Sequence, residues 1–175
     1  MQPKADFFMK TFKKIFMNRA CSRSGFSLVE LLITLALIAV MATIAVPQFQ
    51  RYSTNADLKT AAREVMADLF AARQMAVENS VTIYRMTFDV GGNSYVLSRN
   101  PPAAWENVWL APKSLASFGN GIRLVSVNFS GGSTVNFQRR GTVSGGNVTL
   151  TNRLGSTAAI TVNITGRTYV QYTMQ

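Results

Sequence analysis

The sequence LLITLALIAVMATIAV at residues 31–46 decides the fold class, because it contains no charged side chain. Extending it back to Phe26 gives 21 residues interrupted only by Ser27 and Glu30. About 20 apolar residues in a helix are enough to span a bilayer. Six basic residues precede the segment: Lys4, Lys10, Lys13, Lys14, Arg19 and Arg23. This charge distribution predicts a cytoplasmic N-terminus and a remainder that crosses the membrane.

An ordinary secretory signal peptide is one interpretation of this segment. Such a peptide has a basic start, an apolar middle and a cut at small residues, here near residues 43–45. The apolar core is at the long end for that class, and Glu30 interrupts its start. A carboxylate inside a membrane is costly and needs a partner. Glu30 therefore favours the other interpretation, an anchor that stays on the mature chain.

The residues that lead into the apolar segment carry a specific resemblance. Arg-Ser-Gly-Phe-Ser-Leu-Val-Glu at 23–30 resembles the class III signal of type IV prepilins. This resemblance implies that a membrane peptidase cuts between Gly25 and Phe26 and N-methylates Phe26. It implies a leader of residues 1–25 and a mature chain that keeps its apolar helix. Met9 and Met17 would serve equally well as the translation start of a shorter leader.

The position of Glu30 has a physical reason of its own. The cut would create a cationic amine at Phe26, at the positive end of a helix, where a carboxylate in the first turn is favoured. Glu30 is the nearest carboxylate to that amine. Two partners are open for it: the amine of its own chain, or the amine of a neighbouring subunit, which would set the axial register of a filament.

Composition argues against catalysis. The chain has no histidine, and its single cysteine, Cys21, lies in the predicted leader. The carboxylates are scattered singly, so general acid–base, zinc and cysteine or histidine nucleophile schemes lack their usual side chains. We therefore expect no enzyme activity, no catalytic residue, no metal site and no cofactor.

Charge gives only a weak indication of partners. The net charge is +10, but six of the 18 basic residues and one of the eight acidic residues lie in the predicted leader. Removing them leaves 12 and 7, a net charge of +5. A mild excess of this size is usually a solvated surface, although it permits binding to a polyanion.

The helix is predicted to continue beyond the membrane segment. Pro47 predicts a kink or local melting, because proline removes a helical hydrogen bond. Apolar residues then recur at helical spacing up to about Asn79: Leu58, Ala61, Ala62, Val65, Leu69, Ala72 and Ala76. We expect a transmembrane half over 26–46 and an amphipathic half over 47–80, which together make one helix of about 50 residues and 80 Å.

Beyond Asn79 the apolar period changes from helical to two, which predicts a β-rich domain over 81–175. Residues 81–88 and 95–98 flank the turn Gly91-Gly92-Asn93 and predict a hairpin. Residues 100–120, which include three prolines, predict an irregular loop. Further strands are expected at 122–129, 134–137, 148–151, 158–164 and 168–172, with glycine pairs between them. Together these features predict an antiparallel sheet lying on the helix.

Four segments of the mature chain also resemble the GspH/FimT family of minor pilins and pseudopilins: 68–79, 135–141, 146–150 and 160–167. The resemblance implies an α+β, pilin-like fold, with a long N-terminal helix packed on an antiparallel β-sheet domain. It implies a minor pilin that helps initiate or cap a pilus. The alternative is a minor pseudopilin of a type II secretion system. Pro47 favours the pilus, because many pilins carry a proline there and many pseudopilins lack one.

A third possibility is a receptor for DNA at the pilus tip. Some FimT-type minor pilins of competent bacteria take up DNA through a C-terminal GRxR loop, which Gly166-Arg167-Thr168-Tyr169 resembles. The second arginine of that motif is replaced here by Tyr169. Arg139, Arg140 and Arg153 are further candidates for phosphate contacts, and Tyr169 is a candidate for stacking on a base. The alternative, which we favour, is that Arg167 is a solvated turn residue with no DNA contact.

The family resemblance also implies partners and a location. The partners are other pilins or pseudopilins bound through the N-terminal helix, the prepilin peptidase and methyltransferase, and the inner membrane. The location is a single pass of the bacterial inner membrane with the C-terminal domain in the periplasm, and then a pilus or pseudopilus filament.

Overall fold

The computed structural model describes residues 25–79, 83–100, 104–130 and 132–175. The chain divides into two compact units, Met1–Ile44 and Ala45–Gln175, and each is described by itself. The predicted leader, apart from Gly25, lies outside the described residues. So do Cys21, the predicted strand residues Val81 and Thr82, Pro101, Pro102 and Gly131.

The predicted helix is confirmed as α2, Leu28–Glu78. It is long and apolar enough to cross a membrane by length and composition. In the first unit its apolar side chains are exposed, as a surface made to meet lipid or other helices would be. The helix continues through Pro47, which lies inside it. A kink at Pro47 stays a prediction.

In the second unit one face of α2 is buried. All seven apolar positions predicted from the sequence lie in the core. Thr54 and Asp68 are buried on the same face. The first buried position is Thr54, so the packed part of the helix runs from there to Ala76.

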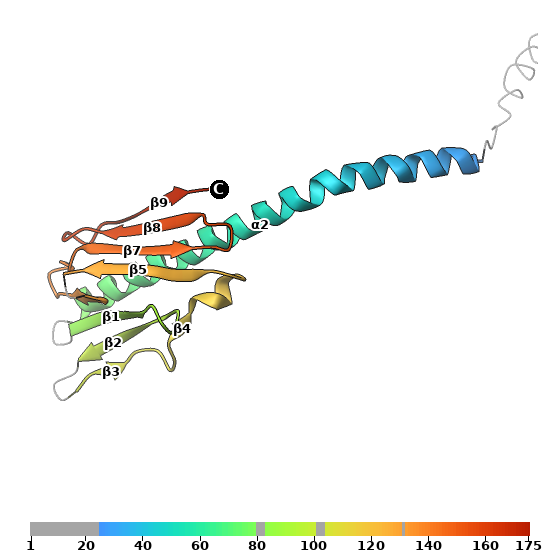
Figure 1. Cartoon of the computed structure of the whole chain (residues 1–175). Coiled ribbons are helices and arrows are strands. Elements are labelled where there is room, and N and C mark those ends of the chain that lie inside the picture. Colours follow the sequence, from blue (N-terminus) through green and yellow to red (C-terminus); the bar gives the residue numbers. More distant parts are fainter. Residues whose placement is uncertain (1–24, 80–82, 101–103, 131) are drawn as a thin grey trace, which may run out of the picture. The chain divides into compact units, whose positions relative to one another are not determined.

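The predicted strands are confirmed, but they form two antiparallel sheets rather than one (Figure 1). The first has the order β3-β2-β1-β6, with β4 also pairing with β2, and the second has the order β5-β7-β8-β9. The strands are β1 Ile83–Asp89, β2 Ser94–Asn100, β3 Glu106–Asn107, β4 Lys113–Ser114, β5 Arg123–Phe129, β6 Thr134–Phe137, β7 Gly146–Thr151, β8 Thr157–Val162 and β9 Thr168–Thr173. Alternation predicts which residues face a core, but it does not predict that β6 pairs with β1 instead of with β5 or β7.

The predicted hairpin is confirmed, and its turn also links the two sheets. Asp89 pairs with Ser94, and Asn93 adopts a left-handed conformation with a φ of 49°. Asparagine tolerates this conformation better than most residues. The Asn93 side chain donates to the Ile122 carbonyl at 2.9 Å and accepts from the Leu124 amide at 2.8 Å. The turn of the first sheet is thereby fixed to the start of β5 in the second.

Residues 104–120 are more ordered than the irregular loop predicted over 100–120. They contain the two short strands β3 and β4 and a 3₁₀ helix, η1, at Leu115–Phe118. Leu115 is fully buried in the core. The sequence pattern missed these elements because two-residue strands are too short to show a period.

Both sheets and α2 share one apolar core. Phe88 of β1 stacks on Tyr95 of β2 and on Phe129 of β5, with ring centroids 5.6 Å and 6.1 Å apart. Aromatic contacts at these separations add to the stability gained from burial. The two sheets of the second unit are therefore parts of one packed domain.

A partly buried ion pair lies at the edge of this core, and the sequence analysis did not predict it. Lys113 Nζ lies 2.8 Å and 2.9 Å from the two carboxylate oxygens of Asp68 and 3.3 Å from Glu64. The Tyr95 hydroxyl donates to Asp68 at 2.7 Å. The Asp68 side chain is only 13% exposed, so these bonds compensate the cost of burying its charge.

This cluster predicts a loss of stability at alkaline pH. Burial and the hydrogen bond to Asp68 raise the pKa of Tyr95 above its usual range. Burial by itself lowers the pKa of Lys113, but Asp68 and Glu64 outweigh it and raise that pKa. Both groups hold their protons more tightly when folded, so their contribution is fully present below about pH 10 and is lost above it.

The measurement is urea unfolding of the detergent-solubilised chain at pH 8 and pH 11, followed by tryptophan fluorescence. We expect the free energy of unfolding to fall with pH, and to fall by about 1 kcal/mol less in Tyr95→Phe, which has no proton to lose at that position. An equal fall in the wild type and in Tyr95→Phe would contradict the role given to the Tyr95 proton.

Candidate functional site

The predicted processing site lies at the start of α2. Gly25 and Phe26 precede the helix, and the Ser27 carbonyl accepts the first helical hydrogen bond, from the Leu31 amide at 3.1 Å. Ser27 is therefore at the N-cap, and Glu30 is the third helical residue. A serine and a glutamate three residues apart form the sequence pattern of a capping box.

The Glu30 carboxylate nevertheless has no bonding partner among the described residues. Within the described part of the chain, neither Glu30 nor Ser27 makes a side-chain hydrogen bond or an ion pair with another residue. Glu30 lies in the first turn, next to the amide groups that carry the positive end of the helix. The carboxylate is thus exposed and available to a cationic partner at this position.

Gly25 has no structural reason to be glycine. A Cβ built on it meets no atom within 4 Å, and its φ does not fall in the left-handed region. The packing of this chain therefore permits a larger residue there. A requirement for glycine at this position has to come from a molecule that approaches the backbone closely, as a cutting enzyme would.

A second group of predicted residues gathers on two turns that meet at Arg73 of α2. Arg73 Nε donates to the Gly141 carbonyl at 2.9 Å. Gly166, with a φ of 76°, lies so close to Arg73 that an added Cβ would be 2.3 Å from Nε and 2.9 Å from the Gly141 oxygen. Three of the segments that resemble the GspH/FimT family therefore converge on one side chain. The role of Arg73 was missed, because neither turn lies near the helix in sequence.

These two turns bring three of the predicted DNA-binding residues into one region. Arg139 and Arg140 lie on the turn that ends at Gly141, and Arg167 follows Gly166 on the other. All three are exposed, and none of the ion pairs in the described residues involves them. Tyr169 is 45% exposed on β9, opposite Thr161 of β8.

Arg153 is not part of this group. It follows β7 at the other end of that strand from the Gly145–Gly146 end, and its side chain donates to Thr54 Oγ1 at 3.1 Å. Thr54 and Arg73 are 19 residues apart on α2, which corresponds to about 28 Å along a helix. One compact ligand therefore does not contact Arg153 together with the other three arginines.

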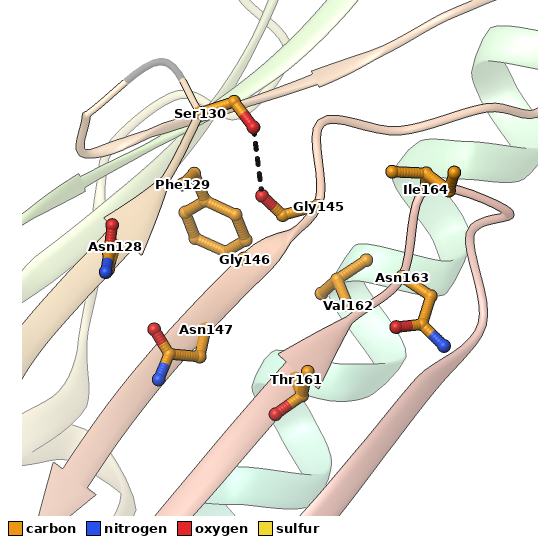
Figure 2. Close-up of a pocket in the computed structure, with 10 residues that line it drawn as sticks. All are labelled: Asn128, Phe129, Ser130, Gly145, Gly146, Asn147, Thr161, Val162, Asn163 and Ile164. Atoms are coloured by element: carbon orange, nitrogen blue, oxygen red, sulfur yellow. Dashed lines mark hydrogen bonds between the residues drawn. The ribbon is translucent and has the colours of Figure 1, made fainter.

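An open pocket of about 540 Å³ lies where β5 ends, β7 begins and β8 ends. Figure 2 shows Asn128, Asn147 and Thr161 projecting from these three neighbouring strands, where they are register partners. None of the residues that line this pocket is ionisable. Across residues 25–79, 83–100, 104–130 and 132–175, no three His, Cys, Asp or Glu side chains gather as metal ligands would.

A processing signal at the start of a long apolar helix, and antiparallel sheets packed on the amphipathic half, define the class of type IV pilin-like subunits. Residues 21–46 match the prokaryotic N-terminal methylation motif. Residues 61–166 match the family described as Type II transport protein GspH. The chain belongs to the GspH family.

Solved structures show the same fold. The minor pseudopilin EpsH from the type 2 secretion system of Vibrio cholerae aligns with a TM-score of 0.54 and 12% identity, over 66% of this chain and 96% of that one. The type IV minor pilin FimU of Pseudomonas aeruginosa aligns with a TM-score of 0.51 and 18% identity, over 69% of this chain and 92% of that one. At these identities the likeness is one of fold.

Curated relatives match over a shorter stretch. Two fimbrial proteins of Pseudomonas aeruginosa are each 33% identical to this chain over 75 residues, which is 40% of this chain and 49% of the relative. The chain thus spans about half the length of the curated relatives it matches.

Family membership fixes the general role. The chain is a structural subunit of the pilin and pseudopilin type rather than an enzyme. Its family implies assembly with other pilins and processing by a prepilin peptidase. Its apolar helix and prepilin motif imply an anchor in the inner membrane.

Proposed function

We propose that this chain is a minor type IV pilin that helps to initiate or cap a pilus. Its leader, residues 1–25, is cut off and Phe26 is methylated. Residues 26–46 then anchor the subunit in the inner membrane, with the amphipathic part of the helix, 47–80, and the β domain, 81–175, in the periplasm. The mature subunit moves into the tip of the filament.

The observation that carries this proposal is the uncommitted carboxylate of Glu30 on an exposed apolar helix. Such a helix is stable in lipid, or packed among the helices of other subunits, but not in water. Burying Glu30 in a filament requires a cation, and the Phe26 amine of a neighbouring subunit has the required charge. The pair would hold neighbouring helices in one register.

A pilus is favoured over a secretion system by two features. Pro47 lies at the membrane exit, and the relatives that share 33% identity are fimbrial proteins. The alternative is a GspH-like pseudopilin of a type II secretion system. Deleting the gene separates the two: loss of surface pili with normal secretion of exoproteins supports the pilin, and the reverse result supports the pseudopilin.

Replacing the carboxylate tests the assembly role. In Glu30→Leu the helix remains apolar and the Gly25–Phe26 bond is unchanged, so we expect normal insertion and cutting. We expect incorporation into sheared filaments to fall at least tenfold, because loss of one charged hydrogen bond is worth about 1.5–3 kcal/mol. Quantitative immunoblots of sheared filaments measure this. Wild-type incorporation of Glu30→Leu would contradict the proposed contact, and Val29→Leu is the matched control.

DNA binding at the pilus tip is a second candidate, supported by the three exposed arginines on adjacent turns. Changing Arg139, Arg140 and Arg167 together to Gln should weaken binding of a DNA duplex to the detergent-solubilised chain. It should also lower the slope of log affinity against log salt by up to about 3, at about 0.9 per phosphate contact. Arg153→Gln, at the distant site, is the control. An unchanged salt slope in the triple variant would remove this candidate.

A further inference from the structure

The second sheet ends on β9, and no other strand of the described chain pairs with its outer edge (Figure 1). β9 pairs with β8 through six consecutive residues without a break in register. Its sequence, TYVQYT, contains no charged residue, no proline and no glycine. Natural edge strands usually carry one of these features or a bulge, because a free row of backbone groups is a template for another chain.

The other sheet edges of the described chain are protected. β5, at the opposite edge of the same sheet, has a register shift between Leu124 and Ser126 and begins with Arg123. In the first sheet β3 and β4 have two residues each, and β6 has four. Among the described strands, β9 is thus the one long edge without a protective feature.

β9 is held in place at both ends. At its start, the Asn163 amide donates to the Arg167 carbonyl at 2.9 Å, which closes the turn from β8. Beyond its end, the Gln175 amide donates to Ser156 Oγ at 3.0 Å. Because β9 is already ordered, a strand that adds to it does not have to order it first.

An apolar pocket of about 540 Å³ lies beside the start of β9. Met66, Ala67 and Phe70 of α2 line one side, and Gly166 and Thr168 line the other. Phe70 is 54% exposed, although it lies in the half of the helix that packs on the domain. The charged side chains of the pocket are Arg73 and Arg167, so its rim is basic.

We propose that β9 accepts an extended strand from a different pilin-like subunit. Main-chain hydrogen bonds along the free edge would supply affinity, and the pocket would supply specificity by taking an alternate side chain of the added strand. The chemistry of the pocket specifies an apolar side chain against Phe70 and a carboxylate near Arg167. This inference rests on the proposed function as a filament subunit.

Charge favours a different subunit over a second copy of this chain. After removal of the predicted leader each copy carries a net charge of +5. All strand pairs of this sheet are antiparallel, so two copies joined at β9 would place their basic pockets at opposite ends of the paired strands, and neither pocket would meet an acidic partner. The net positive charge of both copies disfavours their association, whereas an acidic strand would be attracted to the basic rim.

Site-specific photocrosslinking in cells that assemble filaments tests this proposal. A benzophenone amino acid replaces Phe70 in the full chain, and the control replaces Val125, which is 52% exposed on the protected edge β5. We expect the probe at position 70 to join a β strand of another subunit with its own prepilin motif, identified by mass spectrometry of the adduct. The probe at position 125 should give no such product.

A pair of charge variants provides a second measurement. With the probe moved to Gln171 on β9, Phe70→Glu should lower the yield of the same adduct about tenfold. The substitution removes the aromatic ring that the added strand would cover and puts a charge in its place. Val125→Glu should leave the yield unchanged. Because Phe70 is exposed, Phe70→Glu is expected to fold, and normal helical circular dichroism in detergent checks this.

The outcomes separate this inference from the proposed function. A chain that is cut at Gly25 and present in filaments, but gives no adduct from position 70, would overturn the strand-addition proposal and leave the filament role intact. An adduct to DNA or to a second copy of this chain would also overturn it. A chain that is never cut or never enters filaments would overturn both.

Discussion

A chain that carries Gly25→Leu is expected to remain at precursor length and to stay out of filaments. Gly25 has open space around it in the structure, so the substitution leaves the fold of the chain unchanged. In the peptidase, however, a leucine side chain would hold the backbone away from the reacting groups. A displacement of about 1 Å from the reacting geometry can slow a reaction a hundredfold. Immunoblots of membranes, which separate precursor from mature chain, measure the cut fraction.

A glycine elsewhere in the chain supplies the control for this prediction. Gly91 lies in the exposed β1–β2 turn, where an added Cβ meets only a side-chain oxygen of Asp89 at 3.5 Å. Gly91→Ala should therefore be cut as completely as the wild type. If Gly25→Leu were cut equally well, the residue before the bond would not be read by the peptidase, and the processing site would have to lie elsewhere.

The second large effect is expected on stability, from Gly166→Ala. A non-glycine residue in the left-handed region costs about 1–2 kcal/mol. The new Cβ would also displace Arg73 from its hydrogen bond to the Gly141 carbonyl, and a bond to a charged group contributes about 1.5–3 kcal/mol. We expect the free energy of unfolding to fall by about 3 kcal/mol in total. Urea unfolding in detergent, followed by tryptophan fluorescence, measures it.

Gly132→Ala separates the two contributions. Gly132 has a φ of 82°, close to that of Gly166, but an added Cβ there meets no atom within 4 Å. Gly132→Ala should therefore lower the free energy of unfolding only by the cost of the left-handed conformation, about 1 kcal/mol. Equal losses in the two variants would show that Arg73 does not join the helix to the two turns.

The helix and the strand positions were predictable from the sequence, because both depend on local periodicity. The seven apolar positions from Leu58 to Ala76 all face the core, and each longer strand lies within two residues of its predicted bounds. The pairing of the strands was not predictable, because β1 pairs with β6 across about 50 residues of chain. Local alternation carries no information about partners so far apart, and the single predicted sheet was therefore wrong.

The buried charge at Asp68 shows the same limit. Its spacing of three residues from Val65 and four from Ala72 places it beside the apolar stripe of α2, but the sequence does not indicate that a charged residue there is buried. Its partner Lys113 comes from β4, inside a segment predicted to be an irregular loop. Only the folded chain brings the two together.

For the candidate sites, sequence reasoning defines a location only where a motif is contiguous. Gly25, Phe26 and Glu30 lie within six residues, and the structure adds that the Glu30 carboxylate has no partner among the described residues. The arginines are different, because a positive charge in the sequence does not indicate where the side chain lies in the fold. The structure gathers Arg139, Arg140 and Arg167 around Arg73 and leaves Arg153 beside Thr54.

The central claim is that this chain is processed as a prepilin and keeps its apolar helix. It is tested most directly by the intact mass of the membrane-extracted chain, with and without the prepilin peptidase. We predict a mature chain that begins at an N-methylated Phe26 only when the peptidase is present. A chain that begins near Val46, or that remains uncut with the peptidase present, would contradict the account.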